Sequence, residues 1–319
     1  MLAFGSDDRP PGDLVIGLVN NMPPAARRVT EQQFAGLLTA ASDALDMRIS
    51  LFIVDQLASH TDDAFSVLQQ AKPDGLIVTG AEPRHDAMID EPVWPVLARL
   101  VDWAGEHTIS TVWSCLAAHA AVFRLDQISR RRLPQKLSGV FACMKVADHP
   151  LLEEAPLVWP VPHSRYNSLD EAELCDKGYT VLSHAPRVGA DSFVKQSGAS
   201  LFLMLQGHAE YASESLLSEY RRDIRRFLAG QRAAYPEIPE GYLDQDVVSG
   251  LTTLREQACR TPNLDLLASF GAAITVAPCQ FWYPYAVRLY ASWLCYLAEQ
   301  KVVREQSATW PARHWRVAS

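Results

Sequence analysis

The sequence lacks any apolar stretch near the roughly 20 residues that a membrane-spanning helix requires. Its first residues, MLAFGSDDRPPGD, also lack the basic, then apolar, then small-residue order of a signal peptide. We therefore expect no membrane partner and, by default, a cytoplasmic protein. The 319 residues are 48% hydrophobic and 21% charged, so the chain can bury a large core.

The sequence also has no C-x-x-C pair and no excess of basic residues. Its six cysteines are scattered, so neither a thiolate zinc site nor a short-loop redox motif is indicated, and no metal is expected. The net charge of −8 argues against a nucleic-acid partner bound through a general basic surface. Three local arginine clusters, at 27–28, 130–132 and 221–222, are each expected to form a solvated face.

Strand-like and helix-like runs alternate through the first 125 residues. Apolar strand-like runs occupy residues 14–19, 48–54, 75–78 and 108–112, and helix-like runs occupy residues 30–42, 62–70, 92–105 and 116–123. This alternation predicts an α/β fold with a mainly parallel sheet and helices on both faces. Ligands bind such sheets at the carboxyl ends of the strands, where 20–21, 79–81 and Cys115 fall.

From about residue 133 the pattern changes to shorter strands and hairpin-like pieces. Strand-like runs at 179–182 and 192–195 indicate a more antiparallel section, and a further strand-like run follows at 200–205. A strong helix signal follows at 213–230, mixed turn and helix signals at 233–262, and a last apolar helix at 283–298. We expect one domain over 1–230 and a mainly helical C-terminal extension over 231–319 packed on that domain.

Cys115 is the candidate nucleophile. The segment W-S-C-L-A at 113–117 follows a strand-like run and precedes a helix-like run. Cys115 is therefore expected at a strand-to-helix turn, with its sulfur near a helix N-terminus that favours the thiolate. His119 lies one helical turn later, and we interpret it as packed against its neighbours rather than as a site residue.

A histidine and a glutamate with suitable spacing follow the run at 200–205. In G-H-A-E-Y at 207–211, side chains two residues apart can project the same way from an extended segment. Glu210 could then orient His208 for proton transfer with Cys115.

Several motifs together resemble one enzyme family, the homoserine O-acyltransferases of the homoserine O-succinyltransferase type. In the family's order, from about residue 14 to 230, the matching stretches are N-N-M-P at 20–23, T-E-Q-Q-F at 30–34, D-G-L-I-V-T-G-A at 74–81, V-W-P at 93–95, the cysteine turn, K-L-S-G-V at 136–140, P-H-S-R-Y at 162–166, Q-G-H-A-E-Y at 206–211 and E-Y-R-R-D at 219–223. The resemblance implies a flavodoxin-like, class I glutamine-amidotransferase-like fold and a role at the start of methionine biosynthesis.

The resemblance also implies a mechanism, ping-pong acyl transfer through a thioester on the cysteine. Cys115 would attack an acyl-coenzyme A, with His208 as proton acceptor and Glu210 as its partner. The positions that match the family's amino-acid-binding residues are Lys136, Ser164 and Arg222. Acyl-coenzyme A would be a co-substrate, with no bound cofactor, the partners would be small molecules, and the family's habit suggests a homodimer.

A tetrahedral intermediate needs hydrogen-bond donors aimed at its oxyanion. We expect these to be the backbone N–H of Leu116 and one from residues 80–82, taken as Ala81.

The chain departs from the family pattern around these motifs. After T-G-A, Glu82 replaces a proline, and Arg84 occupies the position associated with acyl choice, which is small in succinyl users and acidic in acetyl users. If Arg84 points into the site, its charge favours an acyl chain that ends in a carboxylate; otherwise it faces solvent or pairs with Glu82 or Asp86. Leu116 stands where the family commonly has tryptophan, and His119 replaces a glutamine.

Two other function classes stay open. Cys, His and Glu on this fold also form glutaminases, although the turn lacks the glycine-flanked G-x-C-x-G form and no synthetase partner domain is visible. The second class is a non-catalytic binding paralogue, in which the three residues survive only as packing. The acyl donor, succinyl or acetyl, is also open from the residues alone.

Overall fold

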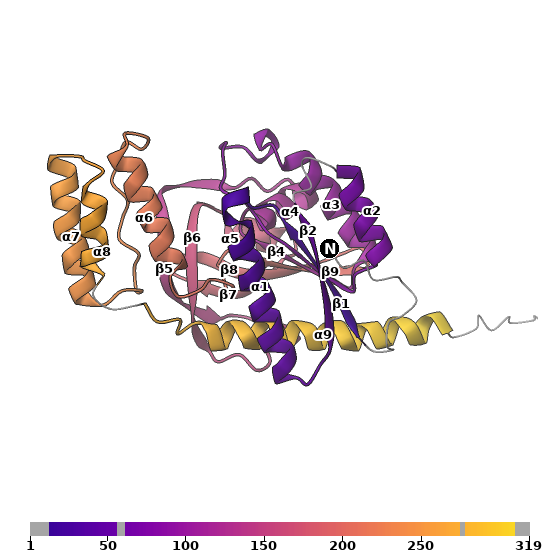
Figure 1. The fold of residues 1–319 in the computed structure, drawn as a ribbon. Coiled ribbons are helices and arrows are strands. Elements are labelled where there is room, and N and C mark those ends of the chain that lie inside the picture. Colours follow the sequence, from indigo (N-terminus) through magenta and orange to yellow (C-terminus); the bar gives the residue numbers. More distant parts are fainter. Residues whose placement is uncertain (1–12, 56–60, 275–277, 310–319) are drawn as a thin grey trace, which may run out of the picture.

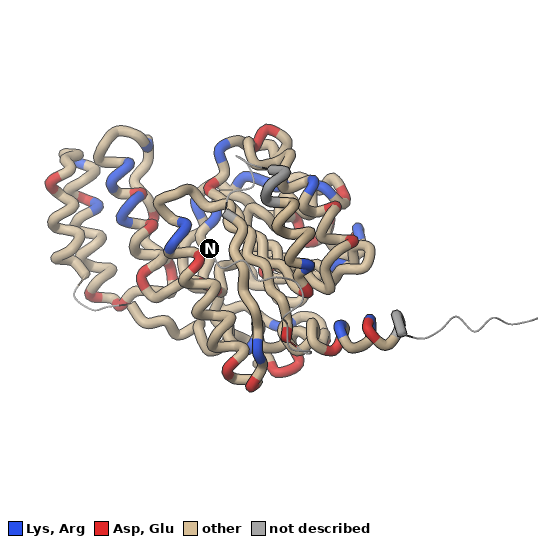
Figure 2. Tube along the Cα trace, turned by 45° about the vertical axis from the view of Figure 1, so that its right-hand side comes forward, with Lys and Arg blue, Asp and Glu red and all other residues tan. Residues whose placement is uncertain are grey.

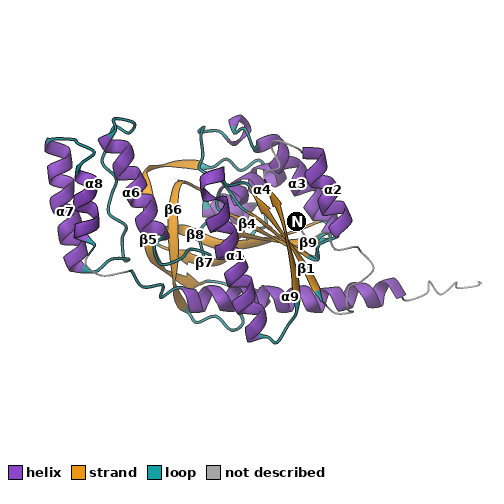
Figure 3. Ribbon diagram, in the orientation of Figure 1, coloured by secondary structure: helices purple, strands orange, loops and turns teal. Residues whose placement is uncertain are grey.

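The fold is built around one mixed β-sheet. The structure is a computed structural model that describes residues 13–55, 61–274 and 278–309; residues 1–12, assessed above for a signal peptide, lie outside them. Within the described ranges nine strands form a single sheet in the order β2-β1-β3-β4-β9-β8-β7-β5-β6 (Figure 1). The predicted α/β class with a largely parallel sheet is confirmed, and Figure 3 shows the sheet enclosed by helices.

Five neighbouring strands form the parallel half of the sheet. They are β1 (Leu14–Asn20), β2 (Ile49–Asp55), β3 (Gly75–Val78), β4 (Ser110–Ser114) and β9 (Ser200–Leu205). Strands β1, β3, β4 and β9 are buried along their whole length, as expected for parallel strands covered on both faces. Their carboxyl ends meet at one edge, which is where the candidate site lies.

The antiparallel half continues from β9. It consists of β5 (Arg131–Lys145), β6 (Val158–Ser168), β7 (Thr180–Ala185) and β8 (Gly189–Ser197). The β7–β8 hairpin confirms the predicted antiparallel section, whereas β5 and β6 are much longer than the short pieces expected. Their prolines fall where strands tolerate them: Pro134 lies in an irregularity of β5, and Pro160 and Pro162 lie in β6, an edge strand of the sheet.

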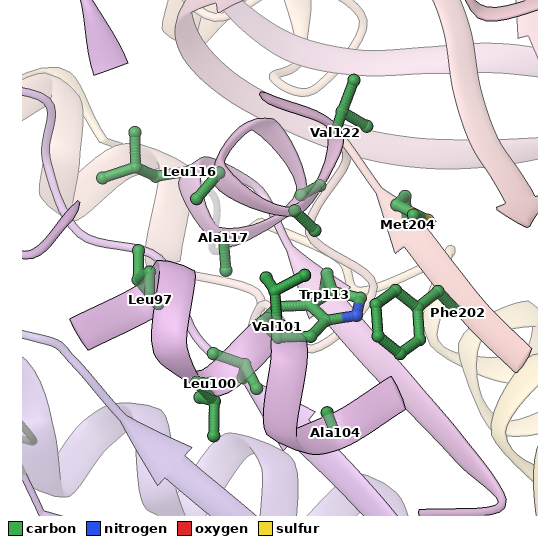
Figure 4. Close-up of a cluster of buried hydrophobic side chains, with 14 of the residues drawn as sticks. Leu97, Leu100, Val101, Ala104, Trp113, Leu116, Ala117, Val122, Phe202 and Met204 are labelled. Atoms are coloured by element: carbon green, nitrogen blue, oxygen red, sulfur yellow. The ribbon is translucent and has the colours of Figure 1, made fainter. Parts of the chain in front are cut away.

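One face of the sheet is covered by α2 (Thr61–Ala71), α3 (Trp94–His107) and α4 (Leu116–Asp126). Trp113 of β4 is fully buried here, and its ring packs against Phe202 of β9 with 5.2 Å between ring centroids. Figure 4 shows the α3 side chains Leu97, Leu100 and Val101 gathered around this tryptophan. The strand that leads to Cys115 is therefore fixed by a close-packed core.

The other face is covered by α1 (Pro24–Ala44) and α9 (Tyr283–Thr309), and α9 runs beneath the sheet in Figure 1. Trp293 of α9 is fully buried and donates a hydrogen bond from Nε1 to Ser110 Oγ at 3.0 Å. A Cβ at Gly75 would lie 2.6 Å from Leu297 and 2.8 Å from Trp293, so only glycine lets α9 approach β3 this closely. The last predicted helix is thus a core element that supports the parallel strands.

A third apolar cluster joins α6 (Ser215–Leu228), α7 (Gln245–Arg260) and α8 (Leu266–Ala273). Figure 1 shows α7 and α8 beyond α6, at the end of the molecule away from α2 and α3. Gly139 of β5 meets this region directly, because its missing Cβ would lie 2.3 Å from the Glu240 carbonyl oxygen. Residues 231–309 thus contribute α7 and α8 to one cluster and α9 to another, and the domain division near 230 stays a prediction.

The described residues also contain three short helices. They are η1 (Met88–Asp90), η2 (Pro150–Leu152) and α5 (Glu171–Asp176). None of the helices in the described ranges is long and apolar enough to cross a membrane. Basic and acidic positions are intermixed along the trace in Figure 2, in keeping with the net charge of −8.

Candidate active site

Cys115 lies at the turn between β4 and α4, as predicted. Its backbone has φ 52° and ψ −111°, a conformation that costs a non-glycine residue of order 1–3 kcal/mol. The turn is held because the Cys115 N–H donates to the Leu205 carbonyl at 2.7 Å and the Cys115 carbonyl accepts from His119 N at 3.2 Å. The surrounding core thus maintains a strained residue whose sulfur is only partly buried.

His208 and Glu210 follow β9 and face this cysteine. His208 Nδ1 lies 2.8 Å from Glu210 Oε1, and the Glu210 residue is only 6% exposed. Cys115 interacts with His208 closely enough to raise the pKa of its imidazole, and Nε2 is the ring nitrogen left free for the cysteine because Nδ1 bonds Glu210. We call Cys115, His208 and Glu210, the three residues predicted to be catalytic, the catalytic cluster.

The protonation of His208 is set by opposing effects. Burial lowers the pKa of the imidazole. The charge of Glu210, and then that of Cys115, raise the pKa by more than burial lowers it, so it lies well above the ordinary value. A histidine that stays protonated beside a cysteine stabilises the thiolate form of that cysteine. The catalytic cluster is therefore electrostatically suited to nucleophilic chemistry.

Two backbone donors lie next to Cys115. A Cβ at Gly80 would be 2.7 Å from the Leu116 backbone nitrogen and 3.0 Å from the Ser114 carbonyl oxygen, so the loop after β3 touches the cysteine turn. Among the described residues, no hydrogen-bond acceptor pairs with the backbone N–H of Ala81 or of Leu116. Both predicted oxyanion donors thus lie beside Cys115 in an unpaired state.

A charged cluster adjoins the catalytic residues, with Glu219 of α6 at its centre. Glu219 Oε2 accepts hydrogen bonds from Lys136 Nζ at 2.9 Å and Ser164 Oγ at 2.5 Å. Burial raises the pKa of Glu219, but Lys136 and the hydrogen bonds lower it more strongly, to about 2. The structure therefore brings the predicted residues Lys136 and Ser164 together around an ionised carboxylate.

Asp223, one turn further along α6, gathers the remaining cations. Its carboxylate is 1% exposed and lies 3.0 Å from Lys136 Nζ, 3.4 Å from Arg222 Nε, and 3.7 Å from both Arg226 Nη1 and Arg232 Nη1. The predicted residue Arg222 also approaches Glu219, at 3.6 Å. We call this group, which comprises Lys136, Ser164, Glu219, Arg222, Asp223, Arg226, Arg232 and Glu82, the charge network.

Glu82 joins the loop after β3 to α6. Both of its carboxylate oxygens accept from Arg226, at 2.6 and 3.0 Å. The bonds from Arg226 lower the pKa of Glu82 more than burial raises it. The residue that replaces the family's proline therefore fixes this loop against the charge network.

The residues without a predicted role include Glu219 and Asp223 of the charge network and Tyr211 beside it. Glu219 and Asp223 lie within the matched E-Y-R-R-D motif, and their spacing of four residues places both on one helix face, a signal that was present in the sequence. Tyr211, at the end of G-H-A-E-Y, donates from its hydroxyl to Glu219 Oε1 and stacks on His208. These three residues connect the catalytic cluster to the charge network.

Arg84 is exposed, and its side chain pairs with neither of the carboxylates considered above. Glu82 bonds Arg226, and Asp86 lies 3.1 Å from Arg132. The Arg84 backbone N–H is fixed instead by Glu91 Oε1 and Oε2, at 3.0 and 3.1 Å. The loop is thus held from within, while the guanidinium of Arg84 is left available at the surface.

Two other expectations from the sequence can be resolved. His119 is buried on α4 and bonds Gln206 Oε1 at 3.0 Å, and burial lowers its pKa to about 3, so it is a neutral packing residue. The expectation of a solvated face at 130–132 was wrong for Arg130, which forms a buried ion pair with Glu91 at 2.6 Å. Arg130 also donates to the backbone carbonyls of His85 and Asp86, so it holds this loop from within the fold.

The described residues also hold a group of three buried potential metal ligands. The donor atoms of Cys143, His163 and Asp191 lie within 4.8 Å of one another. Arg165 Nε donates to His163 Nδ1 at 3.4 Å, so the proton of a neutral imidazole is on Nε2, 3.1 Å from Asp191 Oδ1. Burial also raises the pKa of the Cys143 thiol, and the adjacent guanidinium opposes a cation. These features fit a structural polar cluster.

Comparison with known proteins identifies the family. The family model "Homoserine O-succinyltransferase" matches residues 6–304. A homoserine O-succinyltransferase of Rhodopseudomonas palustris is 44% identical over 307 residues, which cover 89% of this chain and 88% of that protein. One from Methylorubrum extorquens is 42% identical, with 90% and 88% covered. The chain belongs to the homoserine O-succinyltransferase family, and the match extends well beyond residue 230.

A solved structure of the glutaminase domain of Trypanosoma brucei CTPS is also similar to this chain. Its TM-score is 0.49 at 15% sequence identity, and the match covers 72% of this chain and 98% of that domain.

Proposed function

We propose that this enzyme transfers a succinyl group from succinyl-coenzyme A to the side-chain hydroxyl of homoserine through a thioester on Cys115. One observation carries the proposal. Cys115 at a strand-to-helix turn interacts with the hydrogen-bonded pair His208–Glu210, directly beside a network of charged groups suited to an amino acid. The acyl group and the acceptor are those of the homoserine O-succinyltransferase family.

In the first half-reaction the Cys115 thiolate attacks the thioester carbonyl of succinyl-coenzyme A. The developing oxyanion is stabilised by the unpaired backbone N–H groups of Ala81 and Leu116. When the tetrahedral intermediate collapses, the bond to the coenzyme A sulfur breaks and the leaving thiolate takes a proton from His208. The products are free coenzyme A and succinyl-Cys115, with His208 neutral.

The second half-reaction uses the change in charge that acylation produces. A thioester has no negative charge, so one of the two charges that raise the pKa of His208 disappears when Cys115 is acylated. The neutral imidazole then accepts the proton of the homoserine hydroxyl as its oxygen attacks the succinyl carbonyl. The carbon–sulfur bond breaks, which restores the thiolate and the protonated histidine.

The charge network supports amino-acid binding by its composition. It holds four cations, Lys136, Arg222, Arg226 and Arg232, against the three carboxylates Glu82, Glu219 and Asp223. One positive charge is left over, which suits the α-carboxylate of an amino acid, and an arginine fork can bind that carboxylate through two hydrogen bonds. The ionised Glu219 can accept from the substrate ammonium group.

The finer parts of the proposal follow from the family resemblance. We propose that the reaction starts methionine biosynthesis in the cytoplasm and that the enzyme is a homodimer. Sedimentation of the purified protein would test the dimer. Expression of this protein in a methionine auxotroph that lacks the same activity, followed by growth without methionine, would test the pathway.

The decisive experiment is incubation of the protein with succinyl- or acetyl-coenzyme A, followed by intact mass measurement and then by addition of homoserine. We expect a succinyl adduct on Cys115 that disappears when O-succinylhomoserine forms. Steady ammonia release from glutamine would favour the glutaminase class instead. Absence of any adduct with either donor would favour the non-catalytic class.

A further inference from the structure

Tyr211 contacts both the catalytic cluster and the charge network. Its ring stacks on the His208 imidazole, with 4.3 Å between centroids and 17° between the planes. Glu210 fixes the same imidazole at its edge, through Nδ1. The histidine therefore has one partner in the plane of its ring and another against its face.

The hydroxyl of Tyr211 reaches the other group. It donates to Glu219 Oε1, while Oε2 of the same carboxylate accepts from Lys136 and Ser164. Burial, and then the charge of Glu219, raise the pKa of Tyr211 well above its ordinary value, so the phenol remains a neutral donor. One oxygen of the Glu219 carboxylate thus accepts from two predicted amino-acid-binding residues, and the other accepts from Tyr211, which packs against His208.

The backbone of Tyr211 is held by a segment from the C-terminal part of the chain. Its carbonyl oxygen accepts from Gln280 Nε2 at 2.7 Å and from the buried indole Nε1 of Trp282 at 3.0 Å. Its N–H donates to the His208 carbonyl at 3.2 Å, which closes the turn that carries the histidine. Tyr211 is therefore fixed at its backbone, at its ring and at its hydroxyl.

We propose that Tyr211 is a positioning residue that couples acceptor binding at Glu219 to the orientation of His208. The inference rests on the proposed function, because it assigns the two contacts of Tyr211 to different half-reactions. The stack on His208 serves both half-reactions, since the histidine exchanges a proton in each. The bond to Glu219 serves only the second, in which the acceptor occupies the charge network.

The test compares two variants in the two half-reactions measured separately. Tyr211→Phe keeps the stack and removes the bond to Glu219. Acylation of Cys115 by succinyl-coenzyme A should stay within about twofold of wild type, while kcat/KM for homoserine should fall about 10- to 100-fold, the range for a hydrogen bond to a charged group. Tyr211→Leu also removes the stack and should slow acylation itself, by about threefold or more.

Tyr179→Phe is the matched control. Its hydroxyl also donates to a carboxylate, Asp126 at 2.6 Å, and its ring also packs on an aromatic side chain, Phe193. Neither partner belongs to the catalytic cluster or the charge network, so Tyr179→Phe should leave both half-reactions unchanged.

The results separate the inference from the proposed function. If the wild type forms no acyl-enzyme, the proposed function fails first. If the wild type is acylated but Tyr211→Phe slows both half-reactions equally, or leaves the dependence on homoserine concentration unchanged, the coupling role is refuted. A selective loss in the homoserine step, with acylation intact and Tyr179→Phe silent, would establish it.

Discussion

The catalytic cluster and the charge network are built in opposite ways. The catalytic cluster stands on two turns that directly follow the adjacent parallel strands β4 and β9, and a fully buried apolar core holds those strands. The charge network is assembled from β5, β6, α6 and the loops after β3 and α6, and its members hold one another by charge. Backbone geometry fixes the first group, and mutual attraction fixes the second.

This difference assigns separate physical tasks to the two groups. Nucleophilic attack requires placement to within a fraction of an ångström, which a strained turn on a packed strand provides. Binding of a zwitterionic amino acid, the role proposed for the charge network, requires a set of opposite charges, and Lys136, Glu219 and Asp223 supply both signs. Substitutions in the catalytic cluster should therefore affect rate at constant stability, and substitutions in the charge network should affect stability and acceptor binding together.

Loss of the nucleophile should have the largest effect. Cys115→Ala should abolish both the acyl adduct and turnover, because no other group in the catalytic cluster can form the thioester. The thermal unfolding midpoint should change little, since the sulfur is only partly buried and few packing contacts are lost. Residual turnover above about one part in 10⁴ in Cys115→Ala would overturn the covalent mechanism.

Changes to the acid–base pair should rank next. His208→Asn should reduce kcat/KM by roughly 10²- to 10⁴-fold, the usual contribution of general acid–base catalysis. Glu210→Gln should cost less, because the neutral amide still contacts the ring but no longer raises the pKa of His208. Rates of acylation and of homoserine transfer would check this order. A silent Glu210→Gln would mean that the carboxylate has only a structural role.

The same contrast explains how much of the fold the sequence could predict. Strands β3 and β9 occupy exact predicted ranges, 75–78 and 200–205, because each is a short apolar run bounded by turn residues. No range was predicted for strands β5 and β6, in which Pro134, Pro160 and Pro162 interrupt the apolar pattern. Those prolines are accommodated by an irregularity and an edge, which depend on strand order rather than on local sequence.

The site follows the same rule. The pairing of Cys115 with His208 could be predicted because each follows a short apolar strand-like run, in the cysteine turn and in the H-x-E segment. The role of Glu219 could not, because its partner Lys136 is 83 residues away in the chain. Arg130 was misassigned to a solvated face for a similar reason, since its buried partner Glu91 lies 39 residues earlier. Local patterns reveal strand ends, whereas charge partners across the fold require coordinates.

Acid should weaken the charge network selectively. Glu219 has a pKa of about 2 in the folded protein, against 4.5 as its ordinary value, so it contributes stability that is present above about pH 4.5 and is lost as the pH falls toward 2. The full shift corresponds to about 3 kcal/mol. Between pH 6 and pH 3.5, the free energy of unfolding measured with denaturant should fall less for Glu219→Gln than for wild type.

Glu256→Gln is the control for this pH effect. Glu256 is an exposed carboxylate on α7 that lies 3.8 Å from Arg260 Nη2, and such surface pairs contribute little. Its pH dependence of stability should match that of wild type. An equal acid sensitivity in Glu219→Gln and wild type would show that Glu219 does not hold the network by its charge.

The smallest effect is expected at Arg84, the position associated with acyl choice. We propose that its unpaired guanidinium forms an ion pair with the carboxylate of the succinyl group, so the enzyme prefers succinyl- over acetyl-coenzyme A. Arg84 is exposed, and exposed ion pairs contribute about 0.2–1 kcal/mol, so Arg84→Ala should lower the succinyl:acetyl ratio of kcat/KM by only about two- to fivefold. Added salt should reduce the same ratio in wild type, because exposed pairs are screened. Arg132→Ala removes an equal charge that Asp86 already pairs, and it should leave the ratio unchanged. A wild-type preference for acetyl-coenzyme A, or equal ratios in wild type and Arg84→Ala, would mean that Arg84 plays no part in acyl choice and that the selectivity lies within the charge network.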